Sequence, residues 1–450
     1  MGGKARDRGE LEQDGTQDRV ARELLLPVQH YIATEWAGSA VLLSAAITAL
    51  VIANSPLAHA FHALWETKIT LDLAVVTVSL SLHHWVNDGL MALFFFVVGL
   101  EIKRELLHGH LSSPKRAALP AFAALGGMVG PALIYLALNA GGDGSRGWGI
   151  PMATDIAFAL GVLGLLGRGI PTQLRIFLLA LAIVDDLGAI LVIAFFYTEK
   201  LTPGALVAAA GILGFMLLLR RLGVRATAAY LIPGFLFWIA FHESGIHATL
   251  AGVILGVFTP ARHLYDDRTV LSHGRALLDR MERCLKAGDH NEMEATSGKL
   301  EELMVNTESP LERLERKIHP WTAFVVLPIF ALVNAGVEIT SEGLATAARS
   351  PIALGIAGGL VLGKLVGIVA AAWLAVRIGV ASLPDGVCWR HIAGVSLLGG
   401  IGFTVSLFIT ELAFTDPAMV TTAKLSVLVT SALAGVMGFV VLKTMVRRKG

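Results

Sequence analysis

Charged residues are scarce in this chain. Only 16% of its 450 residues are Asp, Glu, Lys or Arg, whereas soluble globular proteins contain about 25%. Apolar residues make up 55% of the chain, and the mean hydropathy is +0.68. This composition excludes an ordinary soluble domain and predicts an integral membrane protein with many helices.

Three further absences narrow the function. The only two cysteines, Cys284 and Cys388, are too few for a disulfide scaffold. A net charge of +1 gives no reason to expect a nucleic-acid partner. No phosphate-binding loop of the GxxxxGK[ST] form occurs, so nothing supports transport driven by ATP.

Long apolar runs are abundant instead. At about 20 apolar residues per membrane helix, the chain predicts twelve spans: 37–55, 86–106, 117–139, 148–166, 174–197, 203–219, 226–242, 245–259, 320–337, 351–376, 391–412 and 419–442. The first run is too long and lies too far into the chain for a signal peptide. Residues 69–82 alternate between apolar and polar and are too short to span, which predicts a small extracytoplasmic β-hairpin.

The distribution of Lys and Arg predicts the orientation. With the N-terminus inside, 30 of the 36 basic residues fall in cytoplasmic segments and four in outer loops. This bias predicts that both termini are cytoplasmic. The predicted domains are a polar tail over 1–35, disordered in its first fifteen or so residues, the membrane domain over 36–442, and a short tail over 443–450. The loop over 260–319 is either a short helical pair around Ala287-Gly288-Asp289 or a charged solvated segment.

Two adjacent carboxylates, Asp185 and Asp186, lie near the centre of an apolar run that is long enough to cross a bilayer. Charged residues at that depth are costly, and they usually mark ion or proton pathways. Asp155 and Lys364 lie inside other spans, so a site of three carboxylates and one ammonium is predicted for a monovalent cation or a proton. The alternative is a buried ion pair that only fixes helix packing. Snorkelling or local pairing is favoured for Lys424.

Two spans carry breaks. The fourth contains Pro151 just before Thr154, and the eleventh contains Gly399, Gly400 and Gly402. Unwound backbone is tolerated in a membrane only where it lines a cavity or is buried in protein. Broken helices in corresponding places of two halves predict inverted-topology repeats, here spans 3–5 and 10–12. If the breaks cross, Asp155 would neutralise the facing helix N-termini and Lys364 the facing C-termini.

Two other functions compete with ion exchange. A sodium-coupled solute symporter would need a substrate cavity, for which the spans hold few polar residues. An intramembrane hydrolase would need aspartates that face each other from separate helices, whereas adjacent residues point about 100° apart on one helix.

Several longer motifs resemble those of the NhaA-type sodium/proton antiporters. They are VNDGLM (86–91), GLEIKREL (99–106), ATDIAFALGVL (153–163), ALAIVDDLGAI (180–190), GIHATLAGVILG (245–256), LGK (362–364) and GIGFT (400–404). The resemblance extends from about Glu35 to the C-terminus. It implies an all-α membrane protein of twelve helices with inverted repeats, in which spans 4 and 11 are discontinuous and cross.

The resemblance also implies roles for individual residues. Asp186 would be the principal ligand of transported Na⁺ or Li⁺, and Asp185 its neighbour, alternately paired with Lys364. Thr154 and Asp155 would line the cation and proton site. A pH-responsive cluster at the cytoplasmic mouth would contain Glu101, Arg104, Glu105, Glu315 and His319. Spans 3–5 and 10–12 would form a core bundle, and spans 1, 2, 8 and 9 the dimer interface.

The function implied is secondary active transport, not enzymatic catalysis. A pH-dependent, electrogenic antiporter in the bacterial inner membrane would extrude sodium or lithium in exchange for external protons, for pH and sodium homeostasis. It would need no cofactor and would form a homodimer in the lipid bilayer. The chain departs from the family in a longer 261–310 segment, in Arg316 where His is common, and in Leu365 where Pro is common.

Overall fold

The computed structural model describes residues 37–72, 77–198, 201–224, 228–261 and 267–446. The predicted disorder of the first fifteen residues lies outside these ranges. A helix, or a pair of helices around a break, lies at each predicted apolar run. Among the described residues, seven helices are long and apolar enough to cross a membrane, or ten if each bent pair is one span. The structure is therefore an all-α membrane protein with one small sheet, and twelve spans remain a prediction.

The first half of the chain is helical apart from one hairpin. The first helix, Ala37–Ala53, is followed at an angle of 114° by α2, a turn that the apolar pattern did not predict. The elements are α2 (Ala58–Glu66), β1 (Lys68–Asp72), β2 (Thr77–Ser81), α3 (Leu82–His84), η1 (Trp85–Leu90), α4 (Met91–Leu107), η2 (His110–Ser112), α5 (Pro114–Asn139), η3 (Asp143–Met152), α6 (Ile156–Leu165), η4 (Gly167–Gly169), α7 (Thr172–Phe196), α8 (Pro203–Arg221), α9 (Ala228–Ser244) and α10 (Thr249–Phe258).

The second half continues the helical pattern. Its elements are α11 (Asp267–Ala287), α12 (His290–Thr307), α13 (Pro310–Trp321), η5 (Thr322–Val326), α14 (Leu327–Asn334), α15 (Ser341–Arg349), α16 (Pro351–Gly358), η6 (Gly359–Gly363), α17 (Lys364–Arg377), α18 (Trp389–Leu398), α19 (Phe403–Ala413) and α20 (Pro417–Val446). The predicted span 320–337 begins ten residues earlier, because Ser309 and Glu312 form a capping box around Pro310.

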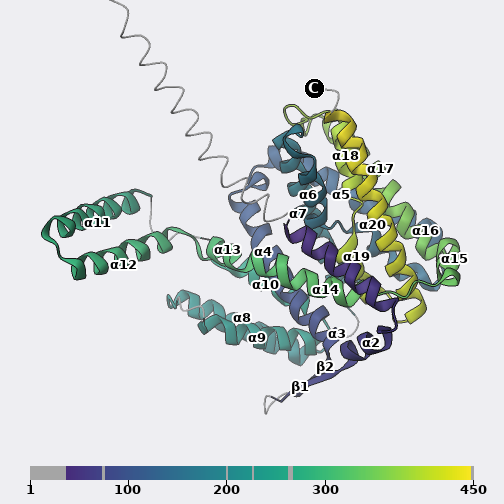
Figure 1. Ribbon diagram of the computed structural model, residues 1–450, viewed down its shortest axis with the longest axis horizontal. Coiled ribbons are helices and arrows are strands. Elements are labelled where there is room, and N and C mark those ends of the chain that lie inside the picture. Colours follow the sequence, from purple (N-terminus) through teal and green to yellow (C-terminus); the bar gives the residue numbers. More distant parts are fainter. Residues whose placement is uncertain (1–36, 73–76, 199–200, 225–227, 262–266, 447–450) are drawn as a thin grey trace, which may run out of the picture.

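Two predictions about the loops are confirmed. Strands β1 and β2 pair antiparallel from Lys68 opposite Ser81 to Asp72 opposite Thr77. Helices α11 and α12 form the predicted helical pair, which lies apart from the other helices (Figure 1). Gly288 ends α11 with a φ of +70°, a value that suits glycine, and the Asp289 carboxylate caps α12 by accepting from the Glu292 backbone.

Close backbone packing joins α5 to η6 and α17. Glycines on the two sides face one another, so the backbones approach as closely as in small-residue membrane interfaces. A Cβ added at Gly130 would lie 2.7 Å from the carbonyl oxygen of Gly363 and 3.1 Å from the Cα of Gly367. This contact holds α17, which carries Lys364, against the helix that also packs on α7.

We expect Gly130→Ala to destabilise the protein by about 1–3 kcal/mol, because the added methyl forces two backbones apart. The control is Gly211→Ala in α8, where nothing lies within 4 Å of the added Cβ. That change should be neutral or slightly stabilising, since alanine favours a helix more than glycine does. Melting temperatures of both variants in one detergent test the packing, and equal values would contradict it.

Candidate functional site

Two helix breaks meet in the centre of the molecule. Helices η3 and α6 are bent by 44° around residues 153–155, and α18 and α19 are bent by 50° around residues 399–402. The Asp155 backbone N–H donates to the Ile401 carbonyl at 2.6 Å, and the Thr154 hydroxyl donates to the Gly399 carbonyl at 2.8 Å. Each break therefore satisfies backbone groups of the other, as burial in an apolar interior requires.

Small residues permit this approach. A Cβ at Gly400 would collide with the Leu360 carbonyl, and one at Gly402 would collide with the Ser406 hydroxyl. That hydroxyl donates to the Ile150 carbonyl at 2.7 Å, which adds another link between the two broken segments. The glycines predicted to mark a break thus lie where backbone touches backbone or a short polar side chain.

Asp155 caps two helices at once. One carboxylate oxygen accepts from the Phe158 backbone N–H at 3.0 Å, at the start of α6. The other accepts from the Thr404 backbone N–H at 3.1 Å and from its hydroxyl at 2.5 Å, at the start of α19. Two helix N-termini place partial positive charge at this point, and a carboxylate stabilises both. Asp155 is only 2% exposed.

Asp185 and Lys364 form a buried ion pair. The Lys364 ammonium donates to an Asp185 oxygen at 2.7 Å, and the two side chains are each 1% exposed. Asp185 lies in the middle of α7, and Lys364 begins α17 directly after the π-helical turn η6. An unpaired charge at this depth would carry a large desolvation cost. Each of the two residues can therefore be buried in its charged form only because the other is present.

Asp186 points elsewhere. Since adjacent side chains on a helix diverge by about 100°, it lies on another face of α7, where it lines a cavity together with Thr154 and Asp155. Asp186 is 3% exposed, and its Oδ1 atom has no hydrogen-bond partner within the described part of the chain. The cavity volume is about 90 Å³, which leaves room for water or a small ion.

The five residues predicted for a pH-responsive cluster lie close to one another beside this cavity. Arg104 pairs with Glu315 and lies 3.7 Å from Glu105, and His319 Nε2 lies 3.9 Å from Glu101. Glu101, Arg104 and His319 line the cavity itself. Glu315, on α13, is 7% exposed, and its Oε2 atom has no hydrogen-bond partner among the described residues. The structure thus connects the cluster to Asp186 through one continuous space.

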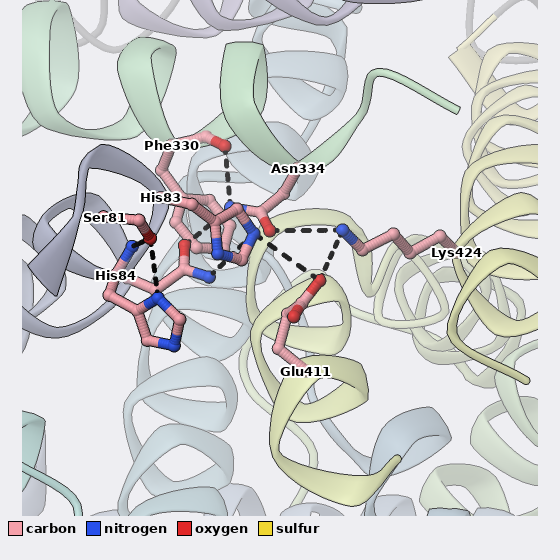
Figure 2. A network of polar contacts seen from close by, with 8 residues as sticks. Ser81, His83, His84, Phe330, Asn334, Glu411 and Lys424 are labelled. Carbon is pink, nitrogen blue, oxygen red and sulfur yellow. Dashed lines mark hydrogen bonds and ion pairs between the residues drawn. The ribbon is translucent and has the colours of Figure 1, made fainter. Parts of the chain in front are cut away.

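A second polar cluster was missed by sequence reasoning (Figure 2). Lys424 pairs with Glu411 at 2.5 Å, so the local pairing favoured for this lysine is confirmed. Asn334 and His83 complete the cluster from two other helices. Glu411 lies in the last turn of one predicted span, and Lys424 lies in the second turn of the next. Both residues therefore lie at the same end of neighbouring helices, and this is the feature of the sequence that could have predicted the cluster.

The site is suited to a small hard cation or a proton. Carboxylate and carbonyl oxygens are the ligands that such cations prefer. The Asp155 oxygens accept from two helix N-termini, and one Asp185 oxygen accepts from Lys364. The other Asp185 oxygen has no partner among the described residues, but Asp185 does not line the cavity, so Asp186 is the carboxylate that offers an unpaired oxygen to it. The arrangement can hold one cation or one proton at a time at this position.

Comparisons with known proteins agree with this chemistry. The sequence profile of the family described as Na⁺/H⁺ antiporter 1 matches residues 29–442. The chain is 46% identical to the Na(+)/H(+) antiporter NhaA of Oleidesulfovibrio alaskensis over 96% of its own length and 97% of the relative's. It is 47% identical to the protein of the same name from Acidithiobacillus ferrooxidans, over 95% and 99% of the two lengths. Identity to the Na(+)/H(+) antiporter NhaA 2 of Pseudomonas syringae is 48%, over 94% and 96%.

Proposed function

Because the chain belongs to the Na⁺/H⁺ antiporter 1 family, it is a transporter and not an enzyme, and we propose that it exchanges intracellular Na⁺ or Li⁺ for external protons at Asp186. The observation that carries this proposal is that Asp186 lines a cavity with an oxygen, Oδ1, that has no hydrogen-bond partner among the described residues, next in sequence to the Asp185–Lys364 pair. The function is pH and sodium homeostasis, and transport needs no cofactor.

The mechanism is competition for one carboxylate. When Asp186 is ionised, its oxygens bind sodium with help from Thr154 and Asp155. A proton neutralises the same oxygens and removes the attraction for the cation, so binding of the two is mutually exclusive. If more than one proton moves per sodium, with Asp185 as the second carrier while it is released from Lys364, transport is electrogenic and uses the membrane potential.

The motion involves two sets of helices. The core set contains the broken pairs and the helices that hold Asp185, Asp186 and Lys364: α5, η3, α6, α7, α16, η6, α17, α18, α19 and α20. The interface set contains the first helix, α3, η1, α4, α10, α13, η5 and α14, within which the glycines of α10 pack directly on α4. We propose that each broken pair is one discontinuous span, that the two cross, and that the core set moves against an interface set that forms a homodimer.

The orientation follows from the basic residues. The protein lies in the bacterial inner membrane with both termini, the 260–319 segment and the cavity mouth in the cytoplasm. The β1–β2 hairpin then lies on the outer side. In this orientation the cavity gives cytoplasmic sodium access to Asp186.

Sodium-induced collapse of an imposed pH difference in proteoliposomes tests the function. We expect added Na⁺ or Li⁺ to release protons from one side to the other between pH 6 and 9, and an ionophore-set membrane potential to change the rate. Vesicles without protein, and choline in place of sodium, are the controls. No sodium-dependent proton movement at any pH, by protein that elutes as a single folded species, would overturn the proposal.

The pH-responsive cluster gives a separate prediction. We expect Glu315→Gln to move the pH profile more than the maximal rate, because it removes the closer of the two carboxylates beside Arg104 and leaves Glu105 at 3.7 Å, which makes the cavity lining more positive. That change in charge favours proton loss from carboxylates sharing the cavity, so half-maximal activity should occur at lower pH. A shift on the order of one pH unit corresponds to about 1.4 kcal/mol.

The matched control is Glu308→Gln. Glu308 is also paired with an arginine, Arg316, but that arginine side chain is 66% exposed, and the pair does not line the cavity. The pH profile of the Glu308→Gln variant should match that of the wild type. An unchanged profile for Glu315→Gln would remove the assignment of this cluster to pH response.

A further inference from the structure

On each of three helices, a cavity-lining residue is followed first by a phenylalanine and then by polar residues, in the direction away from the cavity. On α14, Leu327 lines the cavity, Phe330 follows one turn later and Asn334 one turn after that. Helix α19 repeats the order with Val405, Phe408 and Glu411. On the α4 span, Val98 lines the cavity, Phe95 comes next, and Asn87 and His83 lie further out. The cavity is thus followed by an aromatic layer and then by a polar layer.

The aromatic layer closes the space beyond Asp186. The rings of Phe95 and Phe408 are 5.6 Å apart between centroids, and those of Phe330 and Phe408 are 6.4 Å apart. All three side chains are 3% exposed or less. Since Phe408 belongs to the core set and the other two belong to the interface set, this plug lies on the boundary that the transport motion must cross.

The polar layer also bridges this boundary. Lys424 pairs with Glu411 within the core set at 2.5 Å, and Asn334 donates to Asn87 within the interface set at 2.8 Å. Two contacts link the sets: Lys424 Nζ donates to Asn334 Oδ1 at 3.3 Å, and His83 Nε2 lies 3.9 Å from Glu411 Oε1. Figure 2 shows these groups converging from α3, α14, α19 and α20.

This layer lies far from the cavity mouth. Asn87 and Glu101 belong to one continuous helical span, and fourteen residues of helix separate them by roughly 21 Å. Glu101 and His319 line the cavity, whereas His83 and Asn87 do not and lie at the end of the α4 span opposite to Glu101. The polar layer is therefore placed to control access from the side that the cavity does not reach.

We propose that Glu411, Lys424, Asn334, Asn87 and His83 form an outer latch that holds the site closed to the external side until the core set moves. The proposal rests on the proposed antiport function. In the closed state, the Glu411–Lys424 pair is charge-neutral and is held against the Asn334 amide and the His83 imidazole. Opening outward separates these cross-set contacts and the aromatic plug, while both within-set contacts can persist.

The latch residues set the balance between inward-open and outward-open states, because the cross-set contacts exist only in the first. Asn334→Ala removes the acceptor for Lys424 and should favour the outward-open state. Asn334→Asp replaces that amide by a carboxylate facing the ammonium, which strengthens the cross-set contact and should favour the inward-open state. If Asn334 served only the folding of the protein, the two substitutions would not shift the balance between the inward-open and outward-open states in opposite directions.

Labelling of a cavity cysteine reads out this balance without transport. We would introduce Ala323→Cys, which lines the cavity, after replacing Cys284 and Cys388 by serine, and measure its reaction with a polar maleimide. Asn334→Ala should slow labelling about fivefold, the lower end of typical coupling effects. Asn334→Asp should label at least as fast as the parent but exchange sodium about fivefold more slowly. Equal labelling in all three proteins would overturn the latch.

Cross-linking provides a second, independent test. A short thiol-reactive cross-linker that a reductant can cleave should abolish exchange in an Asn334→Cys/Lys424→Cys variant, and reductant should restore the activity. The matched pair Asn87→Cys/Asn334→Cys joins two interface helices, so cross-linking should leave its exchange rate as it was before treatment. Continued exchange by the fully cross-linked Asn334/Lys424 pair would contradict the latch. Loss of sodium-driven proton movement from the uncrosslinked parent would instead contradict the antiport function.

Discussion

Replacing Asp186 by asparagine is expected to abolish sodium-driven proton movement while leaving the fold intact. The side chain is nearly isosteric, and no hydrogen-bond partner is lost at Oδ1 within the described residues. The negative charge that binds the cation, and the group that carries the proton, both disappear. Loss of one partner from a buried ion pair costs about 3–5 kcal/mol, so cation affinity should fall by roughly 100-fold or more.

Asp143→Asn is the matched control, because it makes the same chemical change at an exposed position at the start of η3. It should exchange sodium at the wild-type rate. Proteoliposome exchange and direct sodium binding by calorimetry should agree for both variants. An Asp186→Asn protein that still exchanges sodium at near-normal rates would remove this residue from the mechanism, and an inactive protein that elutes as aggregate would not count as a test.

Asparagine also removes the pH dependence of binding. In the proposed mechanism, sodium and protons compete for the wild-type carboxylate, so apparent sodium affinity should fall as the pH falls. The amide of the variant takes up no proton in this range, so any residual sodium binding should be nearly independent of pH. The two measurements together distinguish the loss of a ligand from a general loss of structure.

The central site was predictable because its residues are conspicuous in their surroundings. A carboxylate or an ammonium stands out within an apolar span, so Asp155, Asp185, Asp186 and Lys364 could be identified individually. The hairpin was predictable from alternation over 69–82, and the α11–α12 pair from apolar spacing around Gly288. These are local signals, and the structure places the corresponding elements where the local signals lie.

Contacts between distant segments were not predictable in the same way. The sequence did not indicate that Asn334 would meet Asn87, 247 residues away, or that His83 would lie beside Glu411. Glu411 itself lies at the end of an apolar run, where a charge is ordinary. The sequence also did not predict the 114° turn between the first helix and α2. Apolar composition indicates which segments are buried in the bilayer, but it does not indicate where the chain changes direction.

The second large effect concerns Lys364. We expect Lys364→Gln to destabilise the protein by about 3–5 kcal/mol, because Asp185 is left buried without its counter-charge. The double variant Asp185→Asn/Lys364→Gln removes both charges and should recover much of this stability. Lys286→Gln is the control: its ion pair with Glu282 is exposed on both sides, so its loss should cost less than about 1 kcal/mol.

The destabilisation of Lys364→Gln should become smaller as the pH falls. In Lys364→Gln the cost arises from an ionised Asp185, and proton uptake by that carboxylate removes the cost. The difference in melting temperature between wild type and variant should therefore narrow as the pH falls, and the double variant should show no such narrowing. A single variant as stable as wild type at high pH would show that the pair contributes little to the fold, and that Lys364 is retained for transport alone.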